Sequence, residues 1–342
     1  MDGFRAALAS DHLRPLWDVM QMLAPREPNA GGQPIHWDWH TLHGHILEAG
    51  ELITAEEAER RVLVLENPDF VGEGRATNSL YAGVQMVLPG EVAPSHRHTA
   101  SALRLILQGE GGYTAVDGER HVMRRGDFVV TPSGMFHEHG NLGDEPVMWL
   151  DGLDVFVVNL LNAPFGEGHP ERSQPRVRPD GYALARYGAG LLPHGHEGGR
   201  TETPFFVWPF ERTRRALFEV AGGGALDPCL GVKLDYADPA SGRSPIRTMT
   251  GSMQLLPAGF SGAPYRCTAG AVFAVVEGSG VAKVGDREFD LKPNDIFVAP
   301  GWIWRSLEAS DKEDLVLFSF SDEVLQRDLG FWREMREPSE QG

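Results

Sequence analysis

The feature that most constrains the fold is an internal repeat of short apolar runs separated by glycine and proline. Residues 90–111 align with 259–280, and residues 128–141 align with 296–309. In both copies the runs are rich in β-branched and aromatic side chains, as at 272–276, which is typical of strands bounded by turns. At 342 residues the chain also exceeds the usual size of one domain. The sequence therefore predicts two β-rich domains of one kind.

The first copy of the repeat contains three histidines at a spacing that suits a metal ion. His96 and His98 are separated by one residue, so in an extended strand both side chains project from the same face. His137 follows within a second stretch, residues 126–141, and a neighbouring strand formed there can bring its side chain to the same ion. Imidazole suits zinc, copper, iron and nickel, and a facial nitrogen site with open positions suits ferrous iron and oxygen chemistry. We predict a metal on these three side chains, and the spacing leaves its identity open.

The second copy of the repeat lacks these ligands. Tyr265, Cys267 and Arg305 stand in the places of the three histidines. They form a poor cage, because a guanidinium repels a cation. We expect this domain to fold and to hold no metal. Other histidine pairs lack the downstream glycine–proline pattern, and we do not expect them to bind metal: His36 and His40, His43 and His45, His194 and His196.

The two histidine stretches resemble the two cupin motifs. The second stretch matches that motif at every defined position: Gly126, Pro132, Gly134, His137 and Asn141. The first departs from it, since Ala102 or Leu103 holds the place of the usual glutamate ligand. The resemblance implies a site of three histidines without a carboxylate. It also implies an all-β dominated bicupin: two jelly-roll β-barrels with a helical N-terminal arm and a short C-terminal helix.

Four segments follow from this layout. They are a helical arm with the first strands (1–75), a metal-binding cupin (76–165), a linker and inter-barrel segment (166–245), and a cupin without ligands that ends in a helix (246–342). Helix-like spacing occurs within 12–23, within 53–65, where Thr54 and Glu57 can form a capping box, and within 321–335. The proline- and glycine-rich stretch 163–204 is expected to be irregular.

Strand parity brings two further side chains towards the predicted metal. Arg104 shares the face of His96 and His98, so its guanidinium should point into the barrel. There it either pairs with a substrate carboxylate or forms an internal salt bridge. His139 shares the face of His137, and it either takes a substrate hydroxyl proton or is a core histidine bonded to backbone.

Two more residues are candidates for substrate binding. Asp151 is placed to anchor Arg104 or to orient a ligand from outside the first coordination sphere. Arg60 begins an apolar strand-like run, and it is either a second clamp for a carboxylate or a surface charge.

Three longer stretches narrow the resemblance. Residues 55–68, 78–104 and 126–141 are similar to gentisate 1,2-dioxygenases and their salicylate and 1-hydroxy-2-naphthoate relatives, and the similarity covers nearly the whole chain. It implies Fe(II) on the three histidines, substrate contacts by Arg104 and His139, a looser match at Arg60, and a homotetramer. The implied enzyme opens gentisate, a small aromatic acid, with O2 between the carboxyl- and hydroxyl-bearing carbons to give maleylpyruvate. Salicylate or 1-hydroxy-2-naphthoate as substrate stays open, and a non-catalytic bicupin that binds a small ligand is a second alternative.

Composition excludes other classes of protein. A formal net charge of −17 argues against nucleic acid as a partner, so an anionic substrate needs local cations. No apolar run approaches the roughly 20 residues that span a bilayer, and the first residues do not resemble a signal peptide. Cys229 and Cys267 are the only cysteines, which favours a reducing compartment. We expect a cytoplasmic enzyme without a membrane partner.

Overall fold

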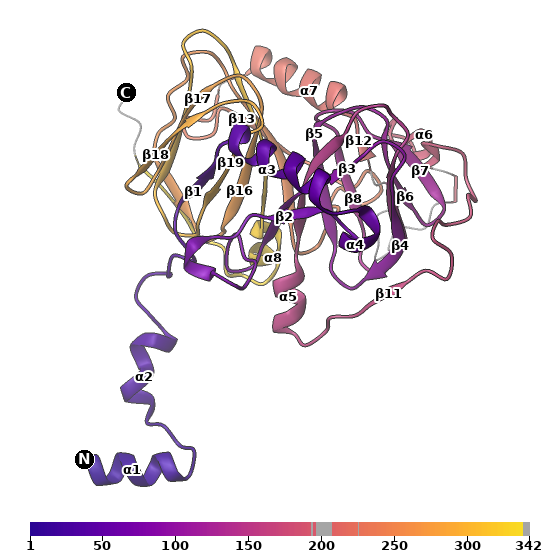
Figure 1. The fold of residues 1–342 in the computed structure, drawn as a ribbon. Coiled ribbons are helices and arrows are strands. Elements are labelled where there is room, and N and C mark those ends of the chain that lie inside the picture. Colours follow the sequence, from indigo (N-terminus) through magenta and orange to yellow (C-terminus); the bar gives the residue numbers. More distant parts are fainter. Residues whose placement is uncertain (193, 196–206, 225, 338–342) are drawn as a thin grey trace.

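The computed structural model describes the chain except residues 193, 196–206, 225 and 338–342. Two antiparallel barrels lie side by side, each made of a six-stranded and a five-stranded sheet (Figure 1). This arrangement confirms the predicted bicupin fold.

The N-terminal barrel contains the first copy of the repeat. Its six-stranded sheet has the order β12 (Val207–Trp208), β8 (Phe128–Thr131), β5 (Ala102–Gln108), β10 (Val147–Leu153), β3 (Tyr81–Val87), β2 (Val62–Val64). Its five-stranded sheet has the order β11 (Gly166–Gly168), β4 (Val92–His98), β9 (His137–Asn141), β6 (Gly112–Val116), β7 (Glu119–Val122).

The C-terminal barrel repeats this plan. Its six-stranded sheet has the order β1 (Ile35–Trp37), β19 (Ile296–Ala299), β16 (Ala271–Glu277), β21 (Leu315–Ser321), β14 (Thr250–Leu256), β13 (Val232–Asp235). Its five-stranded sheet has the order β18 (Arg287–Leu291), β17 (Gly280–Val284), β20 (Arg305–Ala309), β15 (Tyr265–Cys267), β22 (Glu334–Arg336). Strand β1 of this barrel comes from the N-terminal arm, and β12 of the N-terminal barrel comes from the segment between the two barrels. The four segment boundaries stay a prediction.

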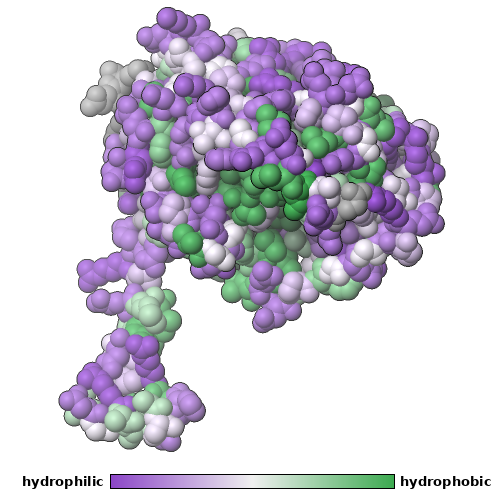
Figure 2. Space-filling view, in the orientation of Figure 1, coloured by the Kyte–Doolittle hydropathy of each residue, from purple (hydrophilic) through white to green (hydrophobic). Residues whose placement is uncertain are grey.

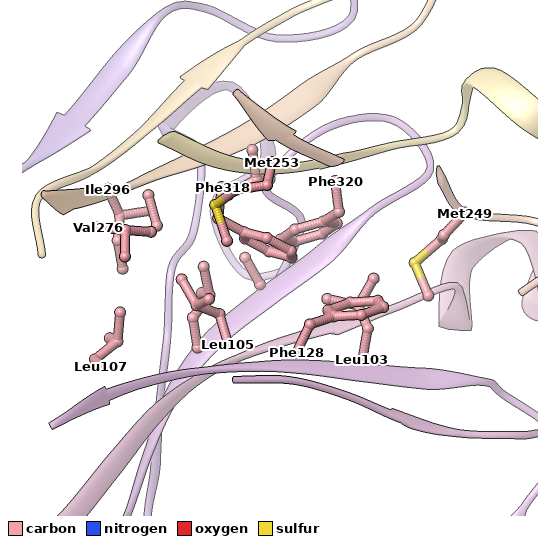
Figure 3. Close-up of a cluster of buried hydrophobic side chains, with 14 of the residues drawn as sticks. Leu103, Leu105, Leu107, Phe128, Met249, Met253, Val276, Ile296, Phe318 and Phe320 are labelled. Carbon is pink, nitrogen blue, oxygen red and sulfur yellow. The ribbon is translucent and has the colours of Figure 1, made fainter. Parts of the chain in front are cut away.

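The two barrels share one hydrophobic core. Figure 3 shows Leu103, Leu105 and Phe128 of the N-terminal barrel against Met253 and Phe318 of the C-terminal barrel. These side chains are almost fully buried, and the rings of Phe128 and Phe318 lie 5.6 Å apart. Burial of this apolar surface stabilises the pair of barrels as one unit. Because these faces of the two sheets pack against each other, the polar side chains of the N-terminal sheet lie on its opposite face.

The helices lie outside the two barrels (Figure 1). They are α1 (Asp2–Ser10), α2 (Leu16–Leu23), α3 (Trp39–Leu52), α4 (Ala55–Ala58), α5 (Val155–Leu160), α6 (Tyr182–Tyr187), α7 (Phe210–Gly223) and α8 (Glu323–Asp328), with a 3-10 turn at Pro68–Phe70. Helices α1 and α2 project away from the barrels (Figure 1). Among the described residues, no helix has the length and apolar character needed to cross a membrane.

Three predictions about helices and loops need correction. The capping box of Thr54 and Glu57 is present, but α4 ends after one turn, because Glu59 takes a positive φ of 52° and the chain continues into β2. The helix expected over 321–335 ends at Asp328, and the chain then pairs with an edge of the barrel as β22. The stretch 163–204 is not wholly irregular, since it contains β11 and α6.

Candidate metal centre

The three motif histidines meet inside the N-terminal barrel. His96 on β4 faces His137 on the neighbouring strand β9, with their rings 4.1 Å apart. His98 lies two residues along β4, with its ring 4.9 Å from that of His137. One nitrogen from each side chain lies within 4.8 Å of the other two, and this is the only such group of potential ligands among the described residues. A shift in the pairing of β4 and β9 just before His96 bends the strand, which is a common way to aim a side chain at a site.

Hydrogen bonds fix which nitrogen is free to bind a metal. His98 Nδ1 lies 2.7 Å from the carbonyl oxygen of Ala100, and His137 Nδ1 lies 3.0 Å from that of Met135. A carbonyl only accepts, so each Nδ1 carries hydrogen and each Nε2 presents a lone pair. The Nε2 atom of His137 is buried and has no hydrogen-bond partner. An acceptor left unpaired in this way is costly unless an ion occupies the space between the rings, so the residues fit a metal.

Burial and positive neighbours keep these imidazoles neutral. Burial, reinforced by Arg60 and His98, lowers the pKa of His96 to about 3. Burial also lowers the pKa of His98, and it lowers that of His137 well below its usual range. A neutral imidazole is the form that binds a metal.

Arg104 and Asp151 form a buried pair behind the histidines. They lie directly opposite each other on β5 and β10, and each is 4% exposed. Arg104 Nε lies 3.0 Å from Asp151 Oδ1, yet its N–H is not aimed at that oxygen, so this contact acts through charge. Burial raises the pKa of Asp151 to about 6 despite Arg104 and a hydrogen bond from Trp149. The internal salt bridge considered for Arg104 is therefore present, and Asp151 lies within contact of the guanidinium, so its role as an anchor stays a prediction.

Arg60 reaches the site, and its interpretation as a surface charge is wrong. It is half-buried, its Nη2 donates to the carbonyl oxygen of Pro94 at 2.8 Å, and the same nitrogen lies against His96 Nδ1. Burial, followed by the charge of Arg104, lowers the pKa of Arg60. Two guanidinium groups thus lie near the histidine cluster in a chain of negative net charge.

His139 is fully enclosed beside the cluster. Its ring packs edge-on against Trp149, and its Nδ1 lies 3.0 Å from the hydroxyl oxygen of Thr114. This nitrogen therefore contacts a side chain and not backbone. Burial, followed by Arg104, lowers the pKa of His139 well below its usual range, so the ring is neutral.

Sequence reasoning missed three residues of β3. Gly83 pairs directly with Asp151, so Tyr81, Gly83 and Gln85 share the face of that carboxylate. A side chain at Gly83 would meet the Tyr81 hydroxyl at 2.7 Å, and Gln85 Nε2 is buried without a partner. The sequence indicates that positions 81, 83 and 85 share one face of a strand, but it does not indicate that β3 pairs with β10.

The other histidine pairs stay apart from this cluster. His36 Nε2 donates to a carboxylate oxygen of Asp295 at 3.0 Å in the C-terminal barrel, and His43 and His45 lie on α3. None of the described members of these pairs belongs to a group of potential metal ligands. His196 lies outside the described residues.

Comparisons with known proteins agree with this geometry. A cupin-domain family model matches residues 83–156. Gentisate 1,2 dioxygenase 1 of Aquipseudomonas alcaligenes is 46% identical over 97% of this chain and 95% of its own length. The gentisate 1,2-dioxygenase of a Streptomyces species is 39% identical over 98% of this chain and 95% of its own length.

A solved structure is similar over the whole chain. The salicylate 1,2-dioxygenase of Pseudoaminobacter salicylatoxidans, in a crystal structure with gentisate, has a TM-score of 0.92 and 30% identity, covering 99% of this chain and 94% of that chain. The similarity to these relatives thus extends over both barrels. The chain belongs to the bicupin family of ring-cleaving dioxygenases that contains the gentisate and salicylate 1,2-dioxygenases.

Proposed function

We propose that this enzyme opens the ring of gentisate with O2, between the carboxyl-bearing carbon and the adjacent hydroxyl-bearing carbon, to give maleylpyruvate. Both oxygen atoms enter the product. The observation that carries the proposal is the cluster of His96 and His98, which are half-buried, with the buried His137 and two arginines beside them. The identity of 46% to a gentisate 1,2 dioxygenase supports the choice of substrate.

We infer that the metal is Fe(II), held by His96, His98 and His137. Three neutral nitrogen donors without a carboxylate leave the full charge of a divalent ion in place, which favours an anionic ligand beside it. When bound, ferrous iron supplies the redox chemistry through which dioxygen attacks an aromatic ring.

The protein's own residues bind and orient the aromatic acid. Arg104 is the principal partner for the substrate carboxylate, and Asp151 holds its guanidinium in place. Arg60 adds a second positive charge next to His96. His139 accepts the proton of the substrate hydroxyl at its Nε2 atom. The barrel wall excludes water from these groups, which strengthens their electrostatic interactions with the substrate.

A substrate panel tests this proposal against its alternatives. Full-length protein is reconstituted anaerobically with Fe(II), and oxygen uptake and near-ultraviolet product absorbance are followed with gentisate, salicylate and 1-hydroxy-2-naphthoate. We expect the largest kcat/KM with gentisate and one O2 consumed per substrate. A preference for salicylate or the naphthoate would reassign the substrate. Binding of all three without oxygen uptake would instead indicate a non-catalytic bicupin. Protein loaded with Zn(II) is the control, since zinc has no redox chemistry.

We also propose that the enzyme is a cytoplasmic homotetramer. Helices α1 and α2 are too short to be stable alone, yet they carry exposed apolar side chains and lie away from the body (Figure 2). These are Met1, Phe4, Leu13, Leu16, Trp17, Met20, Met22 and Leu23. Packing against other subunits would bury them. Free Cys229 and Cys267 suit a reducing compartment. Light scattering should give four times the 37.5 kDa chain mass, and removal of residues 1–24 should reduce it.

A further inference from the structure

Thr114 contacts His139 and has no part in the function proposed above. It stands on β6 directly opposite His139 on β9, and it is fully buried. Its hydroxyl oxygen lies 3.0 Å from His139 Nδ1 and 3.3 Å from the thioether sulfur of Met123, which is also fully buried. The hydroxyl therefore joins a ring nitrogen to a sulfur atom in a region closed to water.

The two contacts of this hydroxyl determine where its hydrogen goes. A thioether sulfur has no hydrogen and can only accept, whereas the hydroxyl has one hydrogen and two lone pairs. If Thr114 donates to Met123, its oxygen accepts from Nδ1–H of His139, and both contacts are hydrogen bonds. If Thr114 donates to Nδ1, only one hydrogen bond forms, and Nε2–H of the ring is left to be satisfied elsewhere. The count of hydrogen bonds favours the first arrangement.

The charges around the ring favour the same arrangement. With Nδ1 bonded to Thr114, Nε2 is the nitrogen that remains for the site. Arg104 and Arg60 both act on the His139 ring through their positive charges. These cations favour a lone pair over an N–H dipole on whichever ring nitrogen is turned towards them.

We propose that Thr114 is a positioning residue that holds His139 in the tautomer with hydrogen on Nδ1 and a lone pair on Nε2. The inference rests on the proposed function for the role of His139. In that role the substrate O–H bond breaks, an N–H bond forms at Nε2, and the electron pair stays on the substrate oxygen. Thr114 continues to accept from Nδ1–H, so it holds the ring orientation before and after proton transfer.

The C-terminal barrel supports this pairing of threonine and histidine. Across β17 and β20, Ala282 lies opposite Leu307, in the register that Thr114 and His139 occupy across β6 and β9. The barrel without histidine ligands has therefore replaced both members of the pair with apolar residues. The barrel that lacks this histidine thus also lacks the hydroxyl that would contact it.

Neutron diffraction of full-length, metal-loaded crystals exchanged into D2O tests the tautomer without any substrate. We expect deuterium on Nδ1 of His139, none on Nε2, and the Thr114 deuteron directed at Met123 sulfur. Deuterium on Nε2 with a bare Nδ1 overturns the proposal. Because this measurement needs no turnover, it decides the tautomer even if the protein cleaves none of the substrates tested.

Kinetics of two variants test the consequence. Thr114→Val keeps the shape and removes the hydroxyl, and Thr114→Ser keeps the hydroxyl. We expect Val to lower kcat by about 10- to 100-fold with little change in KM, a range typical of residues that orient site histidines. Ser should restore most of kcat. If Val and Ser are equally slow, or if Val keeps full kcat, Thr114 does not position the ring. Unfolding curves of both variants show whether a loss comes from stability.

Discussion

The two barrels share one backbone plan and differ in what fills it. His96 faces His137 across one strand pair, and at the same place in the second barrel Tyr265 faces Arg305. The likeness extends to the turn that follows. His98 Nδ1 contacts the carbonyl of the residue two positions on, and Cys267 Sγ does the same at 3.6 Å. The fold therefore does not require the metal ligands, and a barrel of this kind can form without them.

In the C-terminal barrel an arginine replaces the cation-binding group. Arg305 is 5% exposed, its guanidinium lies over the ring of Tyr265 at 4.6 Å, and its Nη2 is 3.0 Å from Cys267 Sγ. None of the ion pairs among the described residues includes Arg305. A positive side chain thus stands in the second barrel at the position of His137, whose Nε2 atom has no hydrogen-bond partner.

The interior of the second barrel is also less polar than that of the first. At equivalent positions in the strand register, the polar residues of the N-terminal barrel have apolar or small counterparts: Phe273 for Arg104, Ala299 for Thr131, Leu307 for His139, and Ser319 for Asp151. Phe273 stacks on Phe297 with ring centres 4.7 Å apart, and these rings fill the interior. The second barrel is thus filled by packed apolar or small side chains at the places where the first barrel has polar ones.

The largest effect should come from removing a predicted metal ligand of the N-terminal barrel. Removing its counterpart in the C-terminal barrel should have no such effect. His137→Ala should abolish stoichiometric metal binding and lower kcat by more than about 100-fold, because even residues outside the first coordination sphere contribute about 10- to 100-fold. Arg305→Met, the matched control, should keep both metal content and activity. Elemental analysis and oxygen uptake check this. Equal metal content in wild type and His137→Ala would remove the proposed site.

The second largest effect should be on stability, and it comes from the buried pair of Arg104 and Asp151. Phe273 and Ser319 stand at these positions in the second barrel. Arg104→Phe leaves Asp151 buried without its cation, which should cost about 3–5 kcal/mol of stability. Adding Asp151→Ser copies the residues of the second barrel and should recover much of that loss. Neither variant should cleave substrate, since both lack the carboxylate clamp. Urea unfolding and oxygen uptake measure the two outcomes separately. If the double variant were no more stable than the single one, the pair would not be the source of the loss.

The same carboxylate should make stability depend on pH. The pKa of Asp151 is raised to about 6 from an ordinary 3.8, so the folded protein binds its proton more tightly than the unfolded chain. Its contribution is fully present below about pH 4 and is lost as pH rises through about 6, by at most about 3 kcal/mol. Urea midpoints of metal-free protein should therefore fall more steeply between pH 4 and 7 in wild type than in Asp151→Asn. Parallel curves would show that Asp151 is ionised throughout.

The sequence predicted those parts of this comparison that depend on local spacing. The alternation of His96 and His98, the parity of Arg104, and the loss of ligands at Tyr265 and Cys267 could all be read along single strands. The repeat predicted two β-rich domains, and the resemblance to a known family implied the bicupin fold; the structure and the comparisons confirm both.

Contacts between distant segments could not be predicted in this way. Arg60 contacts His96 only because β2 joins the sheet at the edge of β3, and its own neighbours in sequence suggest an exposed charge. Thr114 contacts His139 across a strand pair whose register the sequence does not give. The strand β22 was mistaken for helix because its pairing partner, and not its own periodicity, decides its conformation.

The smallest effect, and the finest test of the comparison, is the stability of Arg305→Met. Arg305 Nε and Nη1 are buried and have no hydrogen-bond partner, and no carboxylate pairs with this guanidinium in the described part of the chain. Replacing a buried charge with an apolar side chain of similar length is often neutral or stabilising, because the desolvation cost of the ion disappears. We therefore expect the free energy of unfolding to stay within about 1 kcal/mol of wild type or to rise. Arg104→Met should lower it, because Asp151 then stays buried and unpaired. Equal losses in both variants would show that Arg305 has an anionic partner after all, and that the second barrel contains a charge pair of its own.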